Sequence, residues 1–148
     1  MTSQTMTLPA KTPRKSAAAR KRTKRTSTTA IGRKGEEVAC EELVARGFEI
    51  IARNWRCRYG EADLIAMDGN VVVLVEVKTR RLIHPDDRLM PEIAVGTAKQ
   101  ERYGRIASVF MLEHPDVRSV RFDVMGVGLV EGGEAKVHYI KNAFTWDD

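Results

Sequence analysis

A run of β-branched residues restricts the fold more than any other feature of the chain. Residues 71–77 read VVVLVEV, so six of the seven positions are apolar. A continuous apolar run of this length is typical of a β-strand buried on both faces. Asp68, Gly69 and Asn70 precede it and tolerate the positive φ angles that a tight hairpin turn requires. With a partner strand at 61–67, the sequence predicts a buried β-hairpin at the centre of the fold.

Hydrophobic periodicity predicts one helix before this hairpin and one after it. Residues 32–46 repeat apolar side chains at three- and four-residue steps, and Gly47 is a typical residue for the end of a helix. The second helix is expected to begin at Thr97, because Thr97 and Gln100 have the spacing of an N-terminal capping box. Its apolar face continues to Met111.

The remaining segments complete the expected topology. Strands are predicted at 48–57, 117–127 and 135–140, and the polar stretch 79–91 is predicted to be a loop. The element order is therefore α-β-β-β-α-β-β. A helix between the third and fourth strands permits a parallel crossover, so we expect an α/β fold with a mixed β-sheet flanked by helices.

Charge divides the chain of 148 residues into two parts. Residues 1–30 contain eight basic side chains and no acidic one, whereas residues 31–148 contain 17 basic and 20 acidic side chains. We expect a disordered basic tail over 1–30, since it has few large apolar residues, and a folded domain over 31–148. The tail is open to three interpretations: an electrostatic tether to nucleic acid, a solubilising leader, or an organelle transit peptide.

The composition argues against membrane insertion and secretion. No stretch is long and apolar enough to span a bilayer, and no apolar core with a cleavage site indicates a secretory signal. Cys40 and Cys57 lack the spacing of a metal site and are expected to be small buried residues in a reducing, cytoplasmic compartment.

The expected hairpin brings acidic side chains together. If Gly69 and Asn70 form a two-residue turn, Asp63 faces Glu76 across the hairpin, and Glu61 faces Lys78. A slip of the turn by one residue leaves these side chains on the same face, because the parity of the register survives. Like charges that face each other in a partly buried sheet are destabilising unless they share a proton or a cation.

The residue types in this hairpin suit a divalent metal site. Carboxylate oxygens are the ligands that Mg²⁺ and Mn²⁺ prefer, and substrate phosphates often complete the coordination. Lys78 lies near the expected ion and can orient an attacking water or neutralise charge on a phosphorane. Glu36 shares the core-facing stripe of the first helix and can complete the site. Two plainer interpretations stay open, namely a cross-strand ion pair for Lys78 and a favourable first-turn acid for Glu36.

Basic side chains cluster around the same hairpin. They are expected to contact the phosphate backbone of a nucleic acid, with a charge-protected strand edge as the alternative for the arginines. These candidates are Arg56, Arg58, Arg80, Arg81 and Lys99.

Six segments in sequence order resemble the bacterial YraN family. The resemblance runs from about Gly32 to Phe144 and leaves the basic tail outside it. The segments are GRKGE at 32–36, NWRCR at 54–58, GEADLI at 60–65, VEVKTR at 75–80, RFDV at 121–124 and HYIKNAF at 138–144.

That family in turn resembles the PD-(D/E)xK nuclease superfamily, whose fold restriction endonucleases and archaeal Holliday-junction resolvases share. The resemblance implies a metal-dependent endonuclease fold. Glu36, Asp63, Glu76 and Lys78 match the helix glutamate, aspartate, glutamate and lysine of the superfamily, and Ala62 stands where its name has proline.

The leading hypothesis is hydrolysis of phosphodiester bonds in DNA, including branched or repair intermediates. Asp63 and Glu76, with the Val77 carbonyl, would bind Mg²⁺ or Mn²⁺; Lys78 would orient the water and Glu36 would support the metal. Cutting both strands of a junction would favour a symmetric homodimer. One alternative is a non-catalytic nucleic-acid-binding module of the same fold. Another is an assembly factor whose tail binds RNA or an acidic partner.

Overall fold

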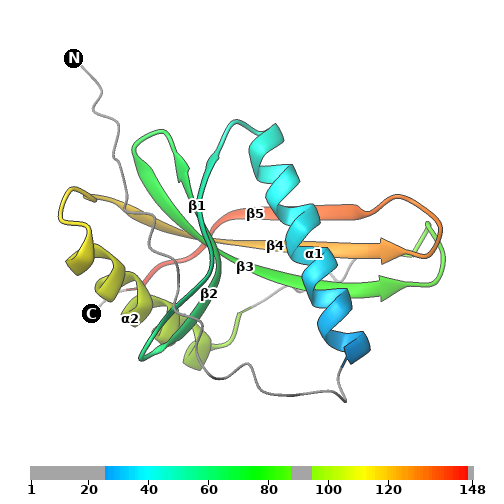
Figure 1. Cartoon of the computed structure of the whole chain (residues 1–148), viewed down its shortest axis with the longest axis horizontal. Helices are drawn as coiled ribbons and strands as arrows, with labels where there is room; N and C mark the ends of the chain where they lie inside the picture. Colours follow the sequence, from blue (N-terminus) through cyan, green and yellow to red (C-terminus); the bar gives the residue numbers. More distant parts are fainter. Residues whose placement is uncertain (1–25, 88–94, 147–148) are drawn as a thin grey trace.

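The structure is a computed structural model that describes residues 26–87 and 95–146 (Figure 1). Within these residues the order is α-β-β-β-α-β-β, which confirms the predicted fold class and topology. No helix in the described ranges is both long and apolar enough to cross a membrane. The elements are α1 (Thr26–Ala45), β1 (Glu49–Cys57), β2 (Gly60–Asp68), β3 (Val71–Leu82), α2 (Thr97–Glu113), β4 (Val120–Val130) and β5 (Lys136–Phe144).

The strands form one mixed sheet in the order β1-β2-β3-β4-β5. Among the strands of residues 26–87 and 95–146, only the β3–β4 pair is parallel, and α2 lies in the crossover between these two strands. Successive residues of β3 alternate between two apolar cores: Val73 and Val75 pack on the side of α1, and Val72 and Leu74 pack on the side of α2. The helices thus cover opposite faces of the sheet (Figure 1).

Helix α1 begins earlier than its sequence pattern predicts. Its first residue is Thr26, so residues 26–30 of the expected tail are helical, and residues 1–25 lie outside the described part of the chain. Ala39, Cys40 and Leu43 form the buried stripe. The helix ends as expected before Gly47, whose φ of 93° lets the Phe48 N–H reach the Leu43 carbonyl at 2.9 Å.

Helix α2 begins at the predicted residue, but the capping box is wrong. Gly96 is the N-cap residue and no side chain caps the helix, so Thr97 is already the first helical residue. The Gln100 side chain instead donates a hydrogen bond to the Val95 carbonyl at 2.8 Å. The predicted apolar face is confirmed, with Tyr103 and Phe110 among its buried residues.

Strand pairing overrides polar sequence at the end of β3. Residues 79–82 were expected to belong to a loop, yet they continue the strand because β4 pairs with β3 as far as Leu82 and Val130. Of the expected loop at 79–91, residues 83–87 follow the strand, and residues 88–91 belong to the segment 88–94, which lies outside the described part of the chain. The last strands are also displaced from their expected bounds, as β4 starts at Val120 and β5 ends at Phe144.

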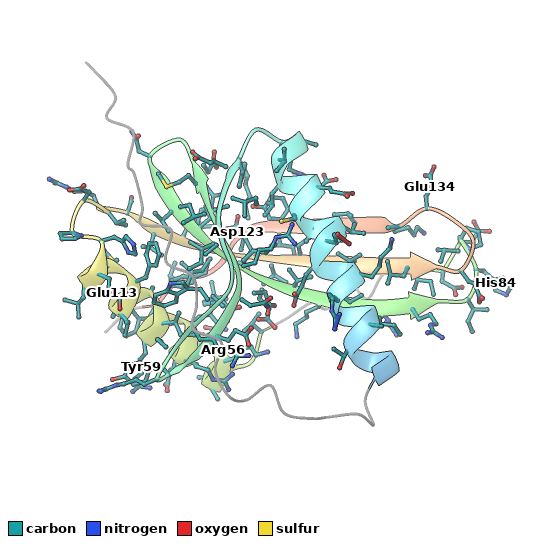
Figure 2. All side chains as sticks on the ribbon, in the orientation of Figure 1. Arg56, Tyr59, His84, Glu113, Asp123 and Glu134 are labelled. Carbon is teal, nitrogen blue, oxygen red and sulfur yellow. The ribbon has the colours of Figure 1, made fainter. Side chains whose placement is uncertain are left out.

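A fully buried acid connects β4 to β5. Asp123 is 0% exposed, and both of its oxygens accept hydrogen bonds from the Arg121 guanidinium at 3.0 Å. The Asn142 N–H, at 2.8 Å, and the Tyr139 hydroxyl also donate to it. Asn142 has a positive φ of 54° at a bulge, where the β4–β5 register shifts. Asp123, near the middle of the sheet in Figure 2, thus fixes the bulged end of β5.

Replacing this acid should destabilise the fold. Asp123→Asn removes one of the two acids that pair with Arg121, the other being Asp68 at 2.9 Å. It also gives the Tyr139 hydroxyl and the Asn142 N–H a weaker, uncharged acceptor, so we expect a loss of about 2–4 kcal/mol in the free energy of unfolding. Urea denaturation of the variant measures this loss. Asp116→Asn, at an exposed site, serves as the control and should change stability by less than about 0.5 kcal/mol.

Candidate active site

The central hairpin has the predicted register, but its ladder ends before the acidic pair. Five cross-strand pairs run from Asp68–Val71 to Leu64–Val75, as a two-residue turn at 69–70 requires. The expected pairing of Asp63 with Glu76 is not formed as a ladder pair. Asp63 Oδ2 instead accepts a hydrogen bond from the Val77 N–H at 2.8 Å. The Asp63 carboxylate therefore accepts the hydrogen bond that a backbone carbonyl of β2 would have accepted if the ladder had continued.

The two strands separate here because the β1–β2 ribbon turns. Leu64 packs in the core under α1, whereas Ala62, two residues away on the same strand, packs in the core under α2. Residues two apart on a regular strand share a face, so β2 changes its orientation around Asp63. Asn54 on the neighbouring strand has a positive φ of 47°, which breaks the alternation of β1 at the same level. Figure 1 shows the ribbon leaving the sheet and approaching α2.

The strand separation opens a cavity of about 440 Å³ along the free edge of β3. Since the Val77 N–H points to this edge, the carbonyl of the same residue points there too. Asp63 and Glu76 contribute to the same wall, so the two acids share one space. The lining residues are Ile31, Gly32, Glu36, Asp63, Glu76, Val77, Thr79, Arg80 and Arg81.

Burial makes the charged form of Asp63 unfavourable. Desolvation and the nearby Glu76 carboxylate raise the pKa of Asp63 to about 7, although the Val77 N–H opposes this rise. No hydrogen bond from the described residues reaches Asp63 Oδ1, which leaves this oxygen to the cavity. The aspartate is therefore a carboxylate that a cation in the cavity would stabilise.

Glu76 is held by two side chains of α2. Its Oε1 accepts a hydrogen bond from the Tyr103 hydroxyl at 2.8 Å, and its Oε2 forms an ion pair with Lys99 at 2.8 Å. The Tyr103 oxygen also accepts a bond from the Asp63 N–H at 3.4 Å. Burial and the carboxylates of Asp63 and Glu76 raise the pKa of Tyr103, so its hydroxyl stays protonated and donates. Tyr103 thus connects the two strands at the point where they part.

Glu36 reaches the cavity from α1. The helix approaches β3 closely, because a Cβ atom at Gly35 would lie only 1.9 Å from Thr79 Oγ1. Glu36 accepts a hydrogen bond from the Asn54 side chain at 3.3 Å. Desolvation by burial raises the pKa of Glu36, with a smaller lowering from Asn54. Asn54, whose positive φ turns β1, therefore also holds the Glu36 carboxylate in place.

Comparison with known proteins assigns the chain to a family. The profile described as "Uncharacterised protein family UPF0102" matches residues 35–127. The chain belongs to the UPF0102 family. The sequence resemblance to the YraN family, which is the same family, is thereby confirmed. The matched range contains Glu36, Asp63, Glu76 and Tyr103 and leaves out the basic N-terminal segment.

Curated UPF0102 proteins match most of the chain. The protein of Clavibacter michiganensis subsp. michiganensis is 42% identical over 117 residues, which cover 76% of this chain and 94% of the relative. The Frankia casuarinae protein is 45% identical over 116 residues, covering 78% and 96%. The Syntrophus aciditrophicus protein is 41% identical over 121 residues, covering 80% and 91%.

The predicted basic residues divide into separate groups in this UPF0102 protein. Arg80 and Arg81 line the cavity, whereas Arg56 and Arg58 lie at the far end of the β1–β2 ribbon. Lys99 is half-buried, and its Nζ pairs with Glu76 at 2.8 Å. Lys78 is half-buried and, within residues 26–87 and 95–146, neither lines the cavity nor forms an ion pair.

Sequence reasoning missed two residues of the site. Tyr103 was assigned to the apolar face of α2, and its hydroxyl gave no signal because its partners lie 27 and 40 positions earlier in the chain. Asn54 was noticed only within the family segment. A lone asparagine in a strand pattern is a signal for positive φ, and here it indicates the bend.

The residues present fit a divalent cation of the Mg²⁺ type. Among the described residues no three His, Cys, Asp or Glu side chains form a complete protein ligand set. Mg²⁺ needs no such set, since it usually binds one or two carboxylates and keeps several waters. Asp63 offers a free oxygen, Glu76 retains lone pairs beyond its two bonds, and the Val77 carbonyl faces the cavity. Oxygen ligands of this kind select hard cations over zinc.

The raised pKa of Asp63 predicts a pH-dependent stability in EDTA. The folded state keeps the proton to about pH 7, whereas the unfolded chain releases it near the ordinary value of 3.8. Stability contributed by the protonated form is therefore present below about pH 4 and is lost between about pH 4 and pH 7. Asp63→Asn removes this loss, so the variant should exceed the parent in stability above about pH 7, by up to about 4 kcal/mol.

Urea denaturation at about pH 5 and about pH 8 measures the difference. The advantage of the asparagine variant should grow with pH, while exposed Asp86→Asn should follow the parent at both values. Parallel pH profiles for the parent and Asp63→Asn would contradict the assignment.

Proposed function

We propose that this protein hydrolyses phosphodiester bonds in DNA with Mg²⁺ or Mn²⁺ as cofactor. One observation carries the proposal: Asp63 and Glu76 stand on strands that separate at this level, and they line one cavity with Arg80 and Arg81. Two acids that would repel each other are useful where a cation joins them, and the arginines suit the phosphates of a substrate. The resemblance to PD-(D/E)xK nucleases supports the same reaction class.

In this proposal Asp63, Glu76 and the Val77 carbonyl hold the ion. When bound, the ion would polarise a phosphoryl oxygen and make water a better nucleophile at neutral pH. Asp63 would then be ionised, because a cation reverses the effect of burial on its pKa. Tyr103 and Lys99 keep the Glu76 carboxylate in place from α2.

The remaining residues of the site would bind the DNA phosphates, orient the attacking water and support the hydration shell of the ion. Arg80 and Arg81 would contact the phosphates that flank the scissile bond. Lys78 lies two residues after Glu76 on β3 but outside the lining of the cavity. Its flexible side chain would have to turn toward the bound ion and substrate, where it would orient the attacking water and neutralise developing charge. Glu36, fixed by Asn54, would support the hydration shell of the ion from the other wall of the cavity. A symmetric dimer would let two such sites act on the two strands of a branched substrate.

A non-catalytic DNA-binding module is the second candidate. The observation that favours it is the ion pair of Lys99 with Glu76, which already supplies a cation to one of the two acids. Such a module would bind branched or single-stranded DNA and would cut none of it. The two candidates share the fold and the metal ligands, and they differ in whether DNA is cut.

Removing either acid should abolish cleavage. Asp63→Asn and Glu76→Gln should each lower Mg²⁺-dependent cleavage by about 100-fold or more, since each removes a ligand of the ion that would neutralise charge on the reacting phosphate. The measurement incubates parent and variants with Mg²⁺ or Mn²⁺ and labelled linear, flapped, four-way and single-stranded DNA. DNA binding in EDTA should be unchanged or tighter, because the variants remove negative charge near the phosphates.

Thermal unfolding with and without Mg²⁺ provides an independent readout. The ion should stabilise the parent and leave Asp63→Asn unchanged, since a ligand raises the unfolding temperature when it binds the folded state in preference to the unfolded chain. Exposed Asp86→Asn should behave as the parent in both assays. Equal cutting by the parent and both site variants would rule out this mechanism, and DNA binding without cutting would select the binding module.

A further inference from the structure

The tip of the β1–β2 ribbon presents an aromatic ring away from the cavity. Cys57 pairs with Gly60, so Arg58 and Tyr59 form a two-residue turn at the end of the ribbon. The Tyr59 side chain is among the exposed large hydrophobic groups, with 37% of the residue accessible. Figure 2 labels Tyr59 at this end of the molecule, near Arg56 and α2.

Two guanidinium groups approach the ring from different elements. The Arg58 guanidinium carbon lies 5.0 Å from the ring centre, and its Nη2 donates to the Tyr59 hydroxyl at 3.2 Å. The Arg105 guanidinium carbon, from α2, lies 5.9 Å from the same centre. Both distances lie within the range of cation–π attraction, about 6 Å. Tyr59 and Arg58 of the ribbon and Arg105 of α2 therefore form one contact between the ribbon and the helix.

Packing against α2 supports the tip of the ribbon. Gly60 has a φ of 138°, and a Cβ atom there would lie 2.9 Å from Arg102 Cδ and 3.7 Å from Ile106 Cδ1. The aliphatic stem of Arg102 thus lies against the backbone of the turn and leaves its charged end exposed. This contact adds a third arginine to the surface beside Tyr59.

The surface has an excess of positive charge. Arg56 is the member that pairs with an acid, Glu61, at 3.7 Å. Within the described residues Arg58, Arg102 and Arg105 form no ion pair, although Glu101 of α2 is also exposed nearby. Three uncompensated arginines around a ring make a site for a polyanion that also carries flat groups.

We propose that this surface binds unpaired nucleotides. A base would take the place of a guanidinium group over the Tyr59 ring, and Arg58, Arg102 and Arg105 would contact the adjoining phosphates. Duplex bases are covered by their neighbours, whereas an unpaired base can place its face on an aromatic ring. Tyr59 lies four residues before Asp63 on the same ribbon, a span of about 13 Å along an extended strand. A short single-stranded segment bridges that distance.

The inference rests on the proposed nuclease function and narrows its substrate class. A strand that begins in the unpaired arm at Tyr59 would continue toward the cavity with Arg80 and Arg81. The expected substrate is therefore DNA with a single-stranded arm next to the position of cleavage, such as a flap or a splayed fork.

Binding of labelled DNA in EDTA, followed by fluorescence anisotropy with the full chain, tests the site without any chemistry. The probes are a fork with two unpaired arms and a fully paired duplex of the same strand lengths. Tyr59→Ala should weaken fork binding by roughly 5- to 150-fold, the usual effect of losing one base–aromatic stack. Tyr59→Phe should keep the affinity of the parent, and duplex binding should change less than about twofold in either variant.

A fork whose arms carry abasic sites separates stacking from charge. It retains every phosphate but has no bases in the arms, so the parent should bind it as weakly as Tyr59→Ala binds the normal fork. Arg58→Gln and Arg105→Gln should each reduce the salt dependence of fork binding by about one counterion. Matched controls are exposed Ile83→Ala, next to His84 at the opposite end of the molecule (Figure 2), and exposed Arg118→Gln.

The outcomes separate the two proposals. Equal fork affinity for Tyr59→Ala and the parent, or equal affinity of the parent for normal and abasic forks, would overturn the stacking site even if the protein cuts DNA. A fork preference that depends on Tyr59, in a protein that cuts no DNA with Mg²⁺, would support the stacking site and reject the nuclease.

Discussion

The hydrogen bond from the Val77 N–H to Asp63 Oδ2 is the interaction on which the site depends. A strand that leaves its neighbour in the interior of a sheet exposes backbone donors, and a buried donor without a partner is costly. Here a side chain replaces the missing backbone acceptor. The same substitution fixes Asp63 beside β3 and leaves its second oxygen to the cavity. The same hydrogen bond therefore ends the β2–β3 ladder and orients the Asp63 carboxylate.

The rest of the architecture keeps the strands apart at that point. Asn54 turns β1, Gly35 lets α1 approach Thr79, and Tyr103 joins the separated strands from the α2 side. Each of these residues sets the course of the backbone or forms a hydrogen bond at the site, in addition to any apolar contact it makes. Two complete cores, one under each helix, provide the rigid support that a site with one buried and one half-buried carboxylate requires.

Local patterns predicted the hairpin and its register well. The Asp68-Gly69-Asn70 turn and the apolar run after it determine which residues face each other, so the proximity of Asp63 and Glu76 followed from sequence. The same rule predicted a ladder that continues to Lys78, and it does not, because the turn of the ribbon depends on Asn54 and on packing with α2. Residues 79–82, of which the first three are polar, form a strand because β4 pairs with them. The partners of Glu76, Lys99 and Tyr103, were not predicted, because the periodicity of α2 indicates only which side chains face the apolar core.

The two bonds to Glu76 also tie the site to the order in which the chain is made. Lys99 and Tyr103 lie 23 and 27 positions after the acid, on the far side of the crossover that leads to α2. A growing chain that has produced only β1, β2 and β3 holds both carboxylates without either donor. The acids then favour an open hairpin, and docking of α2 removes that penalty. The acidic centre is therefore complete only when the helix of the parallel crossover has packed against the sheet.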